Sequence, residues 1–122
     1  MQEQYENYHI KLGITHAIKG WHDRAIEEFK LALNINPNSG LAYYNLGNVY
    51  KNKNLFIDAI DTYEKALSLC FKIPEIYNNL GICYARQKEF DKALNVWEQG
   101  LKQNSDHLDI KKNIEKLKLI KI

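Results

Sequence analysis

The sequence predicts an all-α solenoid built from helix–turn–helix repeats, and three observations carry that prediction. The phrase YYNLGNVY at 43–50 returns as YNNLGICY at 77–84. Within each copy the apolar residues recur at helical spacing, and no segment alternates with the period of a strand. Both prolines, Pro37 and Pro74, fall near the boundaries between the repeated units, where a helix can end or begin.

The offset from position 43 to position 77 is one repeat length, and shifting the chain by it aligns three repeats and the beginning of a fourth. We expect repeats at about 6–39, 40–73 and 74–107 and a capping helix at 108–120, all within one domain of residues 1–122. A glycine inside a helix costs about 1 kcal/mol relative to alanine. Three glycines at one register therefore predict a close approach between the two helices of each repeat. The aligned small and aromatic residues are Gly13, Gly47 and Gly81, then Ala25, Ala59 and Ala93, then Phe29, Tyr63 and Trp97.

These repeats resemble the tetratricopeptide repeat, or TPR, a unit of about 34 residues with a Leu-Gly-x-x-Tyr phrase, then Ala and an aromatic four residues later. The resemblance covers residues 6–107 and implies a right-handed solenoid of about seven helices. It also implies that the first helix of each repeat lines a concave wall, and that the chain binds proteins. The departures are local: His9 and His16 replace aromatics in the first repeat, and Ser105 stands where the third repeat might have proline.

The outward side of each first helix follows from the 100° step per residue. Asn45, Asn79 and Asn113 recur at every repeat length on that side and are expected to form a row along the groove. An Asn amide both donates and accepts hydrogen bonds, so it can pair with the backbone of an extended peptide. The outward residues are, repeat by repeat, Asn7, Ile10, Lys11, Ile14 and Ile18; Leu41, Tyr44, Asn45, Asn48 and Asn52; Glu75, Asn78, Asn79, Ile82 and Arg86; then Asp109, Lys112, Asn113 and Lys116.

From this surface we predict a peptide-binding groove, with Tyr44 placed to stack on a ligand side chain. Two alternatives remain open at this point. Asn at this register can be an ordinary solvated residue of the repeat, and Ile10 and Ile14 can be buried by residues 1–5 instead of making one end of the groove apolar. The predicted groove residues are Asn45, Asn48, Asn79, Tyr44, Asn78, Ile10, Ile14, Arg86 and Asn113.

Some TPR proteins bind the acidic tails of heat-shock chaperones through a clamp of basic residues and Asn. The resemblance places Ile10, Glu75 and Asn79 where that clamp requires Lys or Arg, and Ile14 where it requires its first Asn. Only Asn45 matches the clamp. We therefore expect no chaperone-tail clamp in this chain.

No catalytic or metal-binding motif stands out in the sequence, so we expect neither an enzyme nor a cofactor. HExxH, CxxC, a phosphate-binding loop and a nucleophile elbow are all absent. His9 and His16 lie where the core aromatics belong, so packing is the better interpretation for them than metal binding. The two cysteines lack metal or redox spacing and are expected to be reduced and buried.

The net charge of +2 is too small to argue for nucleic-acid binding. The excess of basic residues lies within 108–122, which contains five Lys and only two acidic residues, Asp109 and Glu115. No aromatic residue interleaves these lysines, which disfavours nucleic-acid binding. No apolar run suggests a signal peptide or a membrane span, so we expect a cytoplasmic protein that binds another protein or peptide. The alternative function is a self-associating scaffold, a homodimer formed through the first helix and the apolar residues of 119–122.

Overall fold

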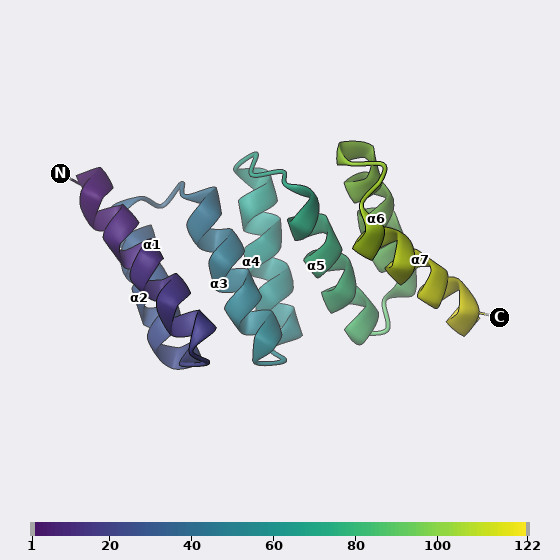
Figure 1. Ribbon diagram of the computed structural model, residues 1–122, viewed down its shortest axis with the longest axis horizontal. Helices are drawn as coiled ribbons and strands as arrows, with labels where there is room; N and C mark the ends of the chain where they lie inside the picture. Colours follow the sequence, from purple (N-terminus) through teal and green to yellow (C-terminus); the bar gives the residue numbers. More distant parts are fainter. Residues whose placement is uncertain (1, 122) are drawn as a thin grey trace. The chain divides into compact units, whose positions relative to one another are not determined.

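The computed structural model describes residues 2–121, and these residues form seven α-helices with no strand among them. The prediction of an all-α fold is therefore confirmed. In chain order the helices are α1 (Gln2–Ile18), α2 (His22–Ile35), α3 (Gly40–Asn52), α4 (Phe56–Ser68), α5 (Pro74–Arg86), α6 (Phe90–Gln103) and α7 (Leu108–Lys121), as Figure 1 shows.

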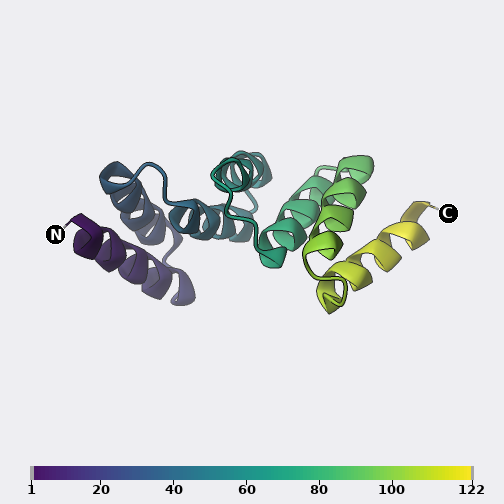
Figure 2. The ribbon, with the colours of Figure 1, turned by 90° about the horizontal axis from the view of Figure 1, so that it is seen from above.

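The helices divide into two compact units, unit 1 ending at Phe71 and unit 2 beginning at Lys72. Unit 1 contains α1 to α4, and unit 2 contains α5 to α7. Within unit 1, α1 packs on α2, α3 packs on α4, and α2 also packs on α3 (Figure 2). Within unit 2, α5 packs on α6, and α7 packs on α6 and touches α5.

Each turn between the first and the second helix of a repeat contains one residue in the left-handed conformation. Gly20, Asn54 and Lys88 have φ of 78°, 62° and 63°, and one repeat length separates each from the next. The residue after each of them returns a backbone bond to the helix; the N–H of Leu55, for example, donates to the carbonyl of Tyr50 at 2.9 Å. This bond is typical of helices that end in a left-handed residue. The turn thus repeats even though its side chain changes.

The close approach predicted from the repeated glycines is present in both units. A Cβ built on Gly47 of α3 would lie 2.7 Å from Cδ1 of Tyr63 in α4. A Cβ built on Gly81 of α5 would lie 2.1 Å from Nε1 of Trp97 in α6. Only a residue without a side chain leaves room for these rings. The prediction that the glycines serve helix packing is therefore confirmed.

The core of each unit lies between its paired helices. The expectation that both cysteines are buried is correct for Cys83 and wrong for Cys70, which is exposed after the end of α4. No helix within the described range combines the length and the apolar character needed to cross a membrane. The buried side chains of the unit 1 core cluster are Ile10, Ala25, Phe29, Ala32, Ala42, Leu46 and Val49.

Candidate functional site

A surface pocket of about 300 Å³ lies between α1 and α3 of unit 1, with a ring from α2 as part of its floor. Three of the predicted groove residues, Ile14, Asn45 and Asn48, line it together. The helix-face pattern therefore placed them on one surface although they come from different helices. The lining residues are Ile14, Ala17, Ile18, Phe29, Asn45, Asn48, Val49 and Asn52.

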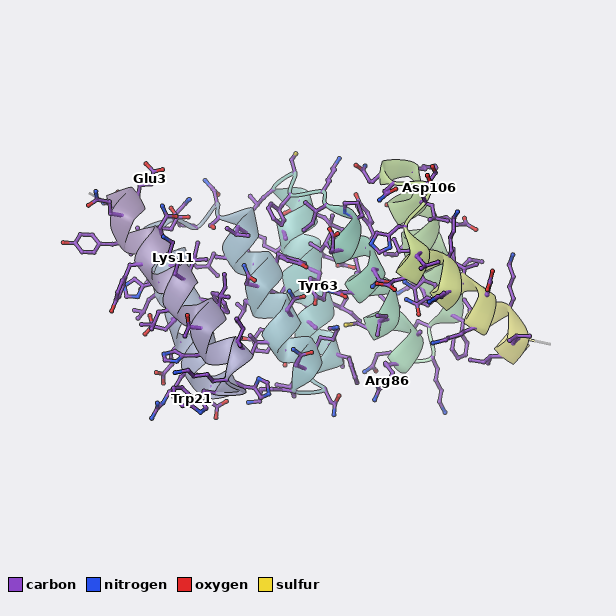
Figure 3. All side chains as sticks on the ribbon, viewed as in Figure 1. Glu3, Lys11, Trp21, Tyr63, Arg86 and Asp106 are labelled. Atoms are coloured by element: carbon purple, nitrogen blue, oxygen red, sulfur yellow. The ribbon has the colours of Figure 1, made fainter. Side chains whose placement is uncertain are left out.

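A pocket of about 250 Å³ lies at the equivalent place in unit 2, between α5 and α7. Every residue that lines the unit 1 pocket has its counterpart here, two repeat lengths further along the chain. Arg86 and Asn113 are the predicted groove residues in this set, and Figure 3 shows Arg86 at the end of α5. The counterparts are Ile82, Ala85, Arg86, Trp97, Asn113, Lys116, Leu117 and Ile120, and Phe90 lines this pocket in addition.

The two pockets differ in charge. Ile18 and Asn48 of the unit 1 pocket correspond to Arg86 and Lys116 of the unit 2 pocket. No Asp or Glu is among the described residues that line either pocket. The unit 1 pocket is therefore apolar with neutral amides, and the unit 2 pocket is apolar with two cations.

The amides of the unit 1 pocket are already held by their own unit. Nδ2 of Asn45 donates to the carbonyl oxygen of Leu41, one turn earlier in α3, at 3.0 Å. Oδ1 of Asn48 accepts a hydrogen bond from the hydroxyl of Tyr63 in α4. Each amide has two hydrogens and one oxygen. These bonds therefore fix the orientation of the side chains; the Asn45 bond uses one of its two amide hydrogens, and Asn48 takes part in a further interaction.

In unit 2 two of the predicted groove amides pair with each other. Nδ2 of Asn113 in α7 donates to Oδ1 of Asn78 in α5 at 2.7 Å. The backbone carbonyl of Asn78 also accepts a bond from Nε1 of Trp97 at 3.1 Å. Asn78 therefore joins α5 to both of its neighbours, which makes it a structural residue.

One predicted groove residue, Ile10, lies elsewhere than expected, and a second, Tyr44, already contacts rings of its own unit. Ile10 is only 4% exposed and belongs to the unit 1 core, where it packs with Phe29 and Leu46; the prediction that it faces outward is wrong. The partners that bury it come from this core cluster. Tyr44 is half-buried, with its ring centroid 6.3 Å from that of Tyr63 and 5.8 Å from that of Phe71. Its ring packs at a tilt against these two rings of its own unit.

The three Asn residues of the predicted row have different surroundings. Asn45 lies in unit 1, whereas Asn79 and Asn113 lie in unit 2. Asn79 is half-buried in α5 and already takes part in an interaction, so it is not a free amide. The role of the row in peptide binding stays a prediction.

A different hollow, of about 530 Å³, lies at the start of α2 around the exposed ring of Trp21 (Figure 3). Nζ of Lys19 lies 4.7 Å from the centroid of this ring, and Cζ of Arg24 lies 5.0 Å from it. Nζ of Lys53 contacts Oδ1 of Asp23 at 2.6 Å beside it. That hydrogen bond and the charge of Lys53 lower the pKa of Asp23. The contacts tie the beginning of α2 to the end of α3.

His9 bonds to a side chain of α2, and His16 packs beside Trp21. Nδ1 of His9 in α1 lies 2.6 Å from Oε2 of Glu28 in α2, and the ring of His16 lies beside that of Trp21. Among the described residues, no three or more His, Cys, Asp or Glu side chains gather as a metal site would require.

The helix-face pattern placed Ile18, Asn52, Ile82 and Lys116 on the outward sides of the helices, but they were not included in the predicted groove. The structure places all four in the two pockets. The signal that could have found them is the repeat register. A position that lines a pocket in one unit is expected to line it in the other.

Residues 1–117 match the family of the tetratricopeptide repeat protein 21 C-terminal ARM domain. Human tetratricopeptide repeat protein 6 is 36% identical to this chain over 55 residues. That match covers 45% of the chain and 11% of the human protein, so the chain spans about a tenth of the length of this curated relative.

Two solved structures share the fold at low sequence identity. The first TPR of Spaghetti (RPAP3), solved with the HSP90 peptide SRMEEVD, has a TM-score of 0.92 at 16% identity, over 96% of this chain and 93% of that one. The TPR domain of Arabidopsis OM64 has a TM-score of 0.93 at 14% identity, over 97% and 98% of the two chains. The repeated glycine register, the paired helices and these matches agree. The chain belongs to the family of the tetratricopeptide repeat protein 21 C-terminal ARM domain, with the all-α fold of TPR proteins.

Proposed function

We propose that this chain is a non-enzymatic protein-interaction module that binds an extended segment of a partner protein. The observation that carries the proposal is the unit 1 pocket, where Ile14, Asn45 and Asn48 from two helices line one apolar hollow. The apolar floor suits a side chain of the segment, and the amide of Asn45 suits its backbone N–H and C=O groups. The similar TPR domain of Spaghetti (RPAP3) was solved with a peptide bound, which supports this class of function.

Backbone recognition favours an extended segment over a helix, because a helix satisfies its own backbone groups. The bond from Asn45 to Leu41 positions the amide before a ligand arrives. Side chains that are already ordered lose less entropy on binding. We do not assign the chaperone-tail clamp to this chain, because Ile10 and Glu75 stand at clamp positions that require a cation.

The test selects binders from a library of 12-residue peptides with the full chain and measures their affinity for Asn45→Ala. We expect this change to weaken binding about fivefold, the equivalent of one hydrogen bond. Asn34→Ala is the matched control, because Asn34 is an exposed Asn of α2 outside the pocket. Failure to select any binder, or equal affinities of the two variants, would contradict the proposal.

Self-association remains the second candidate function, and α7 supplies the observation that favours it. Leu119 and Ile120 are 74% and 67% exposed near the end of this helix, and Leu108 is 61% exposed at its beginning. Ile122, which the sequence also assigned to this surface, lies outside the described residues. A molar mass that rises with concentration in light scattering, and returns to the monomer value in Leu119→Lys, would support it. A constant monomer mass would remove it.

Three expectations drawn from the sequence stay predictions: the absence of nucleic-acid binding, a cytoplasmic location, and a single domain spanning 1–122.

A further inference from the structure

The pocket of unit 2 joins an apolar floor to a cationic rim. Trp97 and Leu117 are 3% exposed each and form part of the floor, and Ile82 is half-buried beside them. Arg86 at the end of α5 and Lys116 in α7 are both exposed and line the same pocket. The two residues come from different helices, and both line the same pocket, so two positive charges lie at one hollow.

The two positive charges belong to the unit 2 pocket alone, and the equivalent repeat positions of the unit 1 pocket are uncharged. The positions of Arg86 and Lys116 hold Ile18 and Asn48 in the unit 1 pocket. Arg86 already takes part in an interaction, so Lys116 carries the larger share of the argument. The described residues that line the pocket include two cations and no carboxylate, which leaves it with a positive field.

We propose that unit 2 binds the part of a partner segment in which an Asp or Glu side chain is adjacent to a large apolar side chain. The apolar side chain enters the pocket between α5 and α7, and the carboxylate lies at Lys116, which lines the same pocket as Arg86. The inference rests on the proposed function, and it names the chemistry that one pocket selects. A neutral polar side chain in place of the carboxylate offers Lys116 no complementary charge, so the charge of Lys116 discriminates between the two segments.

The geometry of an extended backbone allows the two side chains to be neighbours in the segment. In an extended chain, successive side chains point to opposite sides, and a long lysine side chain can cover apolar surface while its charged end stays in water. A carboxylate beside the buried residue therefore points out of the hollow, where the charged end of the exposed Lys116 side chain can meet it outside the apolar floor. An acidic side chain inside the floor would instead lose hydration.

The experiment titrates the full chain with three synthetic peptides and follows them by NMR. All are eight residues long, acetylated and amidated so that no terminal carboxylate is present, with a central Leu-Glu, Leu-Gln or Ala-Glu pair in a Gly-Ser background. The reporter signals are the indole N–H of Trp97 and the side-chain amide of Asn113, because both residues line the pocket. We expect the Leu-Glu peptide to shift both signals and to bind about three- to tenfold more tightly than the Leu-Gln peptide. The Ala-Glu peptide is expected to bind more weakly than Leu-Glu, because it lacks the large apolar side chain.

Two charge variants separate the pocket from the general charge of α7. Lys116→Gln is expected to abolish the preference for Leu-Glu, whereas Lys118→Gln, an exposed lysine of the same helix outside the pocket, is expected to keep it. Lys116→Glu is expected to reverse the preference in favour of a Leu-Lys peptide. The preference should also shrink at high salt, because exposed charges are screened.

Each contrary outcome has a distinct meaning. Equal binding of the Leu-Glu and Leu-Gln peptides, or shifts confined to signals away from the pocket, overturns the charge inference and leaves the proposed function standing. Shifts of the same reporter signals on dilution of the chain alone mean that a second copy occupies the pocket, which also overturns it. If no peptide binds here and no library peptide binds the unit 1 pocket, the proposed function fails with it.

Discussion

The pockets of units 1 and 2 occupy the same repeat positions and present different chemistry. The lining residues of one pocket return two repeat lengths later in the other, so the helix register fixes the place of the hollow. Ile18 and Asn48 give way to Arg86 and Lys116, so the side chains on that register fix the charge of the lining. The comparison shows that in a repeat protein the geometry can keep the location of a pocket while the polarity and charge of its lining change from unit to unit.

The amides at the same register also differ between the units. Asn45 donates to its own helix, whereas Asn113 donates across to Asn78 in α5. The residue equivalent to Asn78 in unit 1 is Ile10, which is buried in the core and offers no acceptor. One substitution thus converts a surface amide into an interhelical bond.

The largest expected effect concerns the close approach that both units share. Gly81→Ala should lower the free energy of unfolding by about 2 kcal/mol, because a Cβ would collide with the indole of Trp97 at 2.1 Å. Gly47→Ala should cost less, because its nearest ring atoms, those of Tyr63, lie at 2.7 Å. Urea unfolding of both variants measures the difference, with Gln99→Ala on an exposed face as the control. A smaller effect for Gly81→Ala than for Gly47→Ala would break this ranking of the two contacts.

The next effect tests whether the two amides have different roles. Asn113→Ala should reduce stability by about 1 kcal/mol, because it removes the bond that joins α7 to Asn78. Asn45→Ala should change stability by less than about 0.5 kcal/mol, because it removes only a bond within α3. Hydrogen exchange of the backbone N–H groups of α7 and α3 measures the stability of each helix separately. Similar protection losses in both helices would show that the two amides are equivalent after all.

A smaller effect is expected when one positive charge of the unit 2 pocket is introduced into the unit 1 pocket. Ile18→Arg places in unit 1 the residue that Arg86 provides in unit 2, at a position that is 82% exposed and tolerates a polar side chain. Binding of a Leu-Glu peptide at the unit 1 pocket should improve about threefold relative to Leu-Gln, as one exposed ion pair allows. Ile18→Gln is the neutral control. An unchanged preference would mean that charge alone does not set specificity at this register.

The smallest expected effect concerns the ion pair that ties α2 to the end of α3 in unit 1. The hydrogen bond and charge of Lys53 lower the pKa of Asp23 below the ordinary value of an aspartate carboxyl. The pair therefore stabilises the folded unit at pH values above the ordinary pKa of an aspartate. This contribution is lost as the pH falls through the lowered pKa of Asp23. An NMR titration of the Asp23 carboxyl carbon should show the pKa rising in Lys53→Gln. Lys51→Gln in the same helix is the control, and a similar rise there would contradict the assignment.

Much of the fold could be read from particular residues of the sequence. The aligned glycines and aromatics predicted the helix pairs and their close packing, because a void at each glycine must receive a ring from the next helix. Pro74 predicted the start of α5, where the structure begins that helix. The left-handed turn residues were not predicted, because Gly20, Asn54 and Lys88 share a position but not a residue type.

The candidate site was only partly readable. The helical period placed Ile14, Asn45 and Asn48 on one surface, and the structure brings them to one pocket. The same period assigned Ile10 to the outside, yet Ile10 packs in the core. A helix wheel describes one helix, whereas burial depends on which neighbours cover each side of it.

By itself, the sequence determined the all-α repeat, its register and its resemblance to the TPR, because these depend on local spacing and on small residues at fixed positions. Only the tertiary structure decided which outward residues line the pockets, which amides pair with each other and where the cations converge. These properties depend on the distance between side chains of different helices. The intrahelical period fixes the direction of a side chain but not the partner that it meets.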